Sequence, residues 1–297
     1  MIRLRRKRGR AMFGNTVAAT GWGESTFAEL AWDKSRSAGL RWALAGAVLG
    51  TAAALVAFAP AAWLARWVAS ASGDRVLLAD ARGTVWSGSA VAVLTGGPGS
   101  RDASALPGRL EWTLGWHGAG LELQARHACC LNGSVALQIR PGFGRYTLNL
   151  VPPSGWVGQW PTAFLGGLGT PWNTMELGGT ARLVAPNFKL ESVQGRWIAD
   201  GRADIELVGV SSRLTTLDTL GSYRLSLTGD AANPGLALLS LSTQEGALQL
   251  SGTGTLGPTG VRFRGEARAA PDAEPVLTNL LNIIGRRNGA RSVISIG

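Results

Sequence analysis

The sequence predicts a mainly β body that follows a single membrane-spanning helix near the N-terminus. Three observations carry this prediction: an uncharged apolar stretch from Ala43 to Leu64, a change to period-two alternation after Trp67, and turn residues that end each alternating run. Only one side of each alternating run is apolar. The strands should therefore form a curved antiparallel sheet with one face covered.

The apolar stretch is long enough to cross a bilayer. Its length as a helix is about 33 Å, against a hydrocarbon core of about 30 Å. Trp42 stands at one end, and Trp63 and Trp67 at the other, where indoles favour the headgroup zone. We predict a transmembrane helix at 42–66, after a disordered tail at 1–41. The alternative is a cleaved signal peptide, which the small residues at 69–71 would permit.

The positive charge is concentrated ahead of this stretch. Residues 1–66 hold ten Lys and Arg against three acids, whereas 67–297 hold nineteen against sixteen, so the body is nearly balanced. This distribution argues against a nucleic-acid partner and predicts that the N-terminus stays in the cytoplasm. Within the stretch, Gly46 and Gly50 form a small-xxx-small pair. The pair is either a helix-packing face or a chance spacing in an Ala-rich helix.

The body after Trp67 reads as two similar units in tandem. Short alternating runs recur in the same order at an offset of about 112 residues, as Gly83 and Gly195 illustrate. We place the units at 67–153 and 188–297, with a connecting helix and strand segment at 154–187. Each unit should end in a short helix, Val157–Leu168 or Glu274–Ile284, followed by a strand, Met175–Val184 or Ser292–Ile296. The alternative to a duplication is chance similarity between Gly-rich β segments.

Few residues in the chain suggest chemistry. Cys129 and Cys130 are the only cysteines, and in an oxidising compartment they could form a vicinal disulfide, a bond to another chain, or two free thiols. With His127 they lack the second ligand pair that a zinc site needs, so we predict no metal site. The glycines at 252–257 match a dinucleotide pattern but precede a strand instead of a helix, so we expect them to form hairpin turns. We therefore predict no cofactor, no catalytic residues and no enzyme.

Tryptophans supply the candidate partner surfaces. Trp86 and Trp197 occupy equivalent places in the two units, where packing in the core is the simpler interpretation and a partner surface the alternative. The connecting segment is less clearly patterned and holds Trp156, Trp160 and Trp172. These three are the better candidates for a partner surface.

The chain resembles protein N of the type II (general) secretion pathway, GspN. Three stretches carry the resemblance, which extends from about Arg41 to Gly297: 58–67 at the membrane exit, GlyThrValTrpSerGlySerAla at 83–90, and 263–292. The resemblance implies a non-enzymatic, single-pass subunit of the bacterial inner membrane with a periplasmic body. It also implies that the partners are other inner-membrane secretion subunits.

Two functions are therefore expected in competition. The first is a membrane-anchored scaffold that positions other secretion subunits while folded proteins are exported across the outer membrane. The second follows from a similarity to periplasmic β-groove proteins of the AsmA type, which implies that the sheet binds or handles membrane lipid. The sequence predicts no oligomeric state.

Overall fold

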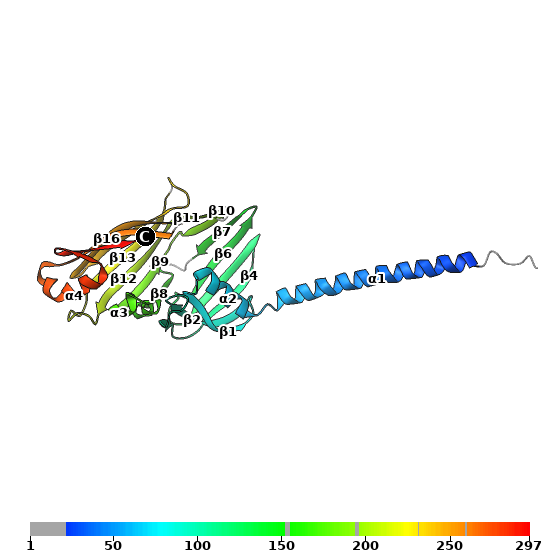
Figure 1. The fold of residues 1–297 in the computed structure, drawn as a ribbon, viewed down its shortest axis with the longest axis horizontal. Helices are drawn as coiled ribbons and strands as arrows, with labels where there is room; N and C mark the ends of the chain where they lie inside the picture. The colour runs from blue at the N-terminus through cyan, green and yellow to red at the C-terminus, as the bar shows by residue number, and fades with distance from the viewer. Residues whose placement is uncertain (1–21, 152–154, 194–195, 231, 259) are drawn as a thin grey trace, which may run out of the picture. The chain divides into compact units, whose positions relative to one another are not determined.

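The computed structural model describes residues 22–151, 155–193, 196–230, 232–258 and 260–297. The chain divides into two compact units, one ending at Ala57 and one running from Phe58 to Gly297. The body is mainly β, and its strands form two antiparallel sheets. The predicted fold class, a mainly β body after an apolar helix, is therefore confirmed (Figure 1).

The first unit contains helix α1, Trp22–Ala57. Its segment Gly39–Ala57 is long and apolar enough to cross a membrane, with 19 residues and a mean hydropathy of 1.6. At about 1.5 Å per residue, the segment is about 28 Å long. Within 1–41, which we expected to be disordered, the structure describes 22–41 as part of this helix; 1–21 lie outside the described residues.

The apolar helix ends earlier than the predicted 42–66. Pro60 has no backbone N–H and disfavours helical conformation in the residue before it, so the helix stops at Ala57 and a new one begins at Ala61. Helix α2, Ala61–Ser72, ends at Gly73 in the left-handed conformation. Residues 61–66 thus belong to the body.

The first sheet is an up-and-down run of neighbouring strands. Its order is β1-β2-β4-β5-β6-β7-β10-β11, with β3 paired to β2. The strands are β1 Val76–Gly83, β2 Ser87–Thr95, β3 Ala103–Ala105, β4 Leu110–His117, β5 Gly120–His127, β6 Ser134–Gly142, β7 Arg145–Val151, β10 Lys189–Val193 and β11 Arg196–Asp200.

The second sheet has the order β17-β18-β16-β15-β14-β13-β12-β9-β8. Its strands are β8 Gly158–Pro161, β9 Leu177–Val184, β12 Arg202–Ser212, β13 Gly221–Gly229, β14 Ala237–Glu245, β15 Leu248–Gly257, β16 Gly260–Ala269, β17 Arg286–Asn288 and β18 Arg291–Ile296.

The sheets do not divide where we placed the two units. β10 and β11 pair with β7 in the first sheet although they lie in 188–297, whereas β8 and β9, from the connecting segment, pair in the second sheet. Alternation identifies a strand and its apolar side but does not name its neighbour. The duplication itself stays a prediction.

One of the two predicted helices forms. Helix α4, Glu274–Ile284, has the predicted bounds and follows the 3-10 turn η2, Pro271–Ala273. The predicted helix at 157–168 is wrong, because its first part is strand β8 and the rest is the 3-10 helix η1, Thr162–Leu168. Pro161 and the glycines at 166 and 167 disfavour an α-helix there. The short helix α3, Trp172–Met175, leads into β9.

The largest core lies between the second sheet and α4. Leu277, Leu280 and Leu281 face one side of the helix and are fully buried, in a cluster with Leu248 and Tyr223. The Tyr223 hydroxyl donates to the Leu248 carbonyl at 2.9 Å, and burial raises the pKa of this phenol. The helix therefore covers the apolar face of the second sheet near β16 and β18.

Candidate functional site

The first sheet carries a continuous apolar face. Strand registers place Leu114, Leu123, Leu137 and Leu150 in one row. The next row contains Trp116, Leu121, Ile139, Leu148, Leu190 and Ala199. Opposed residues in neighbouring strands point to the same side of a sheet, so these two rows form one surface, which we call the apolar face.

This apolar face is covered only at its margins in the described part of the chain. At one margin Ala61 and Leu64 of α2 pack with Trp112 and Leu123. At another, Leu150 packs with Val157 in a small cluster. Between these margins every member of the second row is half-buried or exposed, and Trp116 has 80% of its surface exposed. The surface is therefore available to an apolar ligand or partner.

The opposite face of the same strands is polar. Gln138 donates to Glu122 at 3.2 Å, and Arg145 pairs with Glu191 at 3.3 Å. Near β1 and β2 this face also has a shallow depression lined by polar and charged side chains, among them Arg82, Glu111 and Arg126. The sheet thus separates a polar surface from an apolar one, as the sequence alternation requires.

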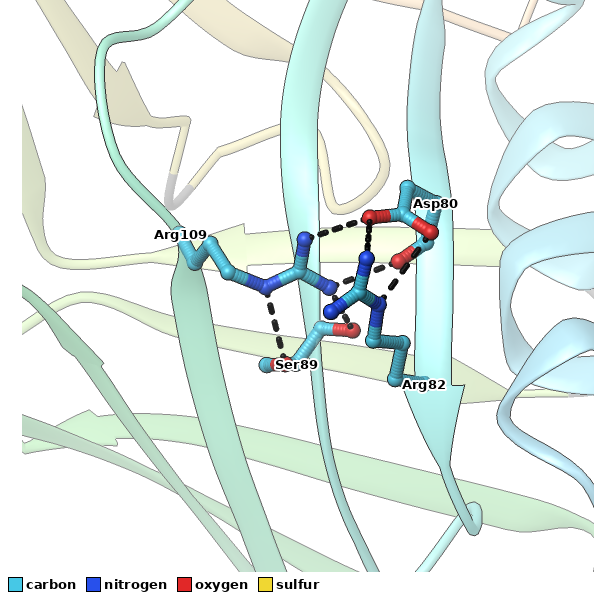
Figure 2. Close-up of polar contacts among 4 residues, drawn as sticks. All are labelled: Asp80, Arg82, Ser89 and Arg109. Atoms are coloured by element: carbon cyan, nitrogen blue, oxygen red, sulfur yellow. Dashed lines mark hydrogen bonds and ion pairs between the residues drawn. The ribbon is translucent and has the colours of Figure 1, made fainter.

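An ionic cluster fastens the start of β4 to the bulge in β1. Asp80 lies in the irregular part of β1 with a positive φ of 47°. Figure 2 shows the Arg109 guanidinium between Asp80 and Ser89, with the Arg82 guanidinium beside it and also reaching the Asp80 carboxylate. Arg109 donates to the Asp80 carboxylate at 2.8 Å, to the Asp80 carbonyl at 2.6 Å, and to the Ser89 hydroxyl at 3.0 Å.

This cluster also sets the ionisation of its carboxyl group. Hydrogen bonds from Arg109, and then from Arg82, hold the pKa of Asp80 below its usual range. The Arg82 guanidinium lies 2.8 Å from the carboxylate but is mostly exposed, whereas Arg109 is the more buried partner. Arg109 hydrogen-bonds to both β1 and β2 and so links the start of β4 to these two strands.

The three tryptophans of the connecting segment lie in different local settings. Trp156 has the Arg182 guanidinium 6.0 Å from its ring centroid. Trp160 is half-buried in β8, opposite Ala181. Trp172 is partly exposed at the start of α3 and lines an open depression with Arg213 and others. Their role as one partner surface stays a prediction.

Trp86 and Trp197, which the tandem-unit prediction places at equivalent positions, differ in exposure. Trp86 is half-buried, but Trp197 is 52% exposed in β11, so the core interpretation is wrong for Trp197. Sequence reasoning also missed Trp116, Phe143 and Tyr146 as surface residues. Alternation placed Trp116 on the apolar side but could not show that nothing in the described body covers it.

The two cysteines lie in the turn after β5. Their sulfur atoms are at bonding distance, and the Cys129 sulfur is 3.3 Å from Nδ1 of His127. The three potential ligand atoms lie within 4.8 Å of one another, but a disulfide would consume both thiolates that a metal requires. The vicinal disulfide and the lack of a metal site stay predictions.

His127 is buried and leaves its Nε2 without a hydrogen-bond partner among the described residues. Burial lowers the pKa of its imidazole, because the charged form loses solvation. The neutral ring is therefore the form that this site favours.

The glycines of the dinucleotide pattern lie inside β15, not in turns as we expected. A Cβ added to Gly252 would collide with the ring of Phe263 in the neighbouring strand β16, and one added to Gly254 would collide with the Arg262 carbonyl and press on the same ring. These glycines therefore make room for an aromatic side chain, which accounts for the pattern. The structure places no helix after them to receive a pyrophosphate, since β15 is followed by β16.

Gly46 and Gly50 lie one turn apart in α1. Among the described residues, no atom lies within 4 Å of a Cβ built at either position. The two face the same side of the helix and leave room for the backbone of another helix. Helix packing at this pair stays a prediction.

Comparison with known proteins decides the family. The family model described as type II secretion system (T2SS), protein N, matches residues 74–294. The chain belongs to this family. The match begins at the start of the first sheet and ends within β18, so it covers both sheets and the ionic cluster. No curated protein and no solved structure was found to match.

Family membership places the chain in type II secretion and among its non-catalytic components. With the apolar helix Gly39–Ala57, it also indicates a single-pass inner-membrane protein. The resemblance inferred from the sequence is therefore confirmed.

Proposed function

We propose that the chain is a single-pass inner-membrane scaffold of the type II secretion machinery, with its N-terminus in the cytoplasm and both sheets in the periplasm. The family match over 74–294 is the observation that carries this proposal. Supporting it are the basic residues before Gly39–Ala57, which favour this orientation, and the uncovered apolar face. The scaffold would hold other inner-membrane secretion subunits and would catalyse no reaction.

Purification from cells that carry the complete secretion machinery tests the scaffold. We expect the full chain, extracted in mild detergent, to bring other inner-membrane secretion subunits with it. Recovery of the chain alone, together with unchanged secretion after its deletion, would contradict the proposal.

A cysteine placed at Ser100 and a membrane-impermeant thiol reagent test the orientation, because this loop should react in cells with a permeabilised outer membrane.

Variants in α1 test whether this helix, and not only the body, binds the partner subunits. We expect Gly46→Leu with Gly50→Leu to weaken recovery of partner subunits, because the larger side chains block close helix approach. Ala52→Leu is the matched control, since it adds similar bulk on the other side of α1. A Trp172→Ala variant tests the connecting segment in the same assay. Equal losses of partner subunits in the glycine variant and its control would show that the Gly46 and Gly50 side of α1 is not a specific packing face.

The apolar face supports a second candidate function, the binding of membrane lipid. Its two rows of side chains could hold acyl chains along the sheet. We expect phospholipid adducts in native mass spectra of the full chain released from detergent. Leu148→Glu should abolish them, whereas Asn149→Glu, the next residue on the polar face, should leave them unchanged. Lipid-free spectra of the wild type would reject this function.

A further inference from the structure

Several strand ends of the first sheet lie along one edge. The registers pair His117 with Gly120, Gly142 with Arg145, and Val193 with Arg196, so three hairpins close at this edge. The strands alternate in direction across the sheet, which also brings the turn between β1 and β2 to the same side. We call this side the tip edge.

Large aromatic side chains are exposed along the tip edge. Phe143 is fully exposed in the turn between β6 and β7, and Trp116 lies one residue from the end of β4. Tyr146 and Trp197 both oppose Ser192 in the sheet, from either side of β10. They share one face about 10 Å apart and are more than half exposed. Such side chains are costly to leave in water without a function.

The same edge is rich in arginine. Arg140, Arg145 and Arg196 are exposed there. Arg145 pairs with Glu191, but Arg140 and Arg196 have no ion pair among the described residues. The acids near the edge are already engaged, because Glu191 also lies near Lys189, and Glu122 accepts hydrogen bonds and faces His117 at 3.5 Å. The edge therefore attracts anions.

The chain enters the body at this edge. Val85, in the turn between β1 and β2, donates to the carbonyl of Ala59 at 2.8 Å, and Pro60 bridges to Thr84. Ala59 is the second residue after Ala57, where the apolar helix ends, and two residues cover at most about 8 Å. Helix α2 then runs away from this edge along the sheet over about 18 Å.

We propose that the tip edge binds the surface of the membrane that holds the span, with its aromatic side chains among the headgroups and its arginines on anionic lipid. Indole and phenol rings favour the interface between headgroups and acyl chains, and arginine adds attraction to anionic headgroups. This inference rests on the proposed function, in which Gly39–Ala57 stays in the bilayer. Binding would hold the first sheet against the membrane, with the apolar face beside the lipid.

Photo-cross-linking in a defined bilayer tests the contact. The full chain, with p-benzoylphenylalanine in place of Phe143, is placed in nanodiscs of phosphatidylethanolamine and phosphatidylglycerol. We expect a phospholipid adduct on the peptide that contains position 143. The control replaces Arg101, which is exposed in the loop after β2 at the opposite end of the sheet, and should give no adduct. Arg140→Glu with Arg196→Glu should lower the adduct yield severalfold.

Each other outcome overturns the inference. Equal adducts at 143 and 101, or none at 143 in a chain that is embedded in the nanodisc, would contradict it while leaving the span intact. Failure of the chain to remain in nanodiscs would contradict both the span and the inference. An adduct that still forms when the chain is irradiated in detergent, after the bilayer has been removed, would indicate lipid held by the body itself. A cross-link from 143 to protein instead of lipid in native membranes would indicate a partner subunit.

Discussion

The two sheets have similar strand patterns but differ in what covers them. In the second sheet, α4 lays Leu277, Leu280 and Leu281 on the strands and buries them fully. In the first sheet, α2 covers only the margin near Trp112, and the described chain leaves the second row of the apolar face open. The second sheet therefore contributes to a fully buried core, whereas the second row of the first sheet stays half-buried or exposed in the described chain.

The largest expected effect is the loss of the α4 core. Leu280→Ala should lower the free energy of unfolding by about 2–5 kcal/mol, because it leaves a cavity among fully buried residues. Thermal unfolding of the full chain in detergent, followed by circular dichroism, measures this loss. Leu148→Ala in the first sheet is the matched control and should cost less than half as much. Equal losses would mean that the first sheet is covered as tightly as the second.

A smaller effect is expected at the ionic cluster. Arg109→Ala removes hydrogen bonds to Asp80 and Ser89 and should lower the melting temperature by about 2–4 °C. Arg82→Ala removes only the exposed partner and should change it by less. Hydrogen exchange should also speed up in β1 and β2 of the Arg109 variant alone. Unchanged exchange in β1 and β2 would show that Arg109 does not stabilise these strands.

The pH dependence distinguishes the buried histidine from the surface. The folded-state pKa of His127 is below its unfolded value, so the unfolded chain binds more protons as the pH falls below about 6.5. His127 should therefore make the protein less stable at pH 5.5 than at pH 7.5. His127→Gln should reduce this difference in melting temperature. Identical pH profiles for wild type and His127→Gln would contradict this assignment.

The smallest effect is expected from the cysteines. A bond between adjacent residues closes almost no loop, so Cys129→Ala with Cys130→Ala should change the melting temperature little. We expect the peptide that holds both residues to gain two mass units on reduction. An unchanged mass would contradict the predicted vicinal disulfide.

Particular residues show what the sequence could predict. Leucines at 277, 280 and 281 follow helical spacing, so the bounds of α4 could be predicted correctly. Pro60 was a signal that the apolar helix would break before Leu64, but composition and length alone placed it inside the span. The exposed aromatics Trp116 and Trp197 could not be recognised, because alternation gives the side of a strand and not its cover.

Local physics determined the apolar helix, the strand alternation, the turns and α4, since each depends on residues near one another in the chain. Tertiary structure decided which strands share a sheet, that β15 uses its glycines to admit Phe263, and that three hairpin ends lie on the side of the first sheet where the chain enters the body. These features depend on pairings between distant segments, and many registers satisfy the same alternation until packing selects one.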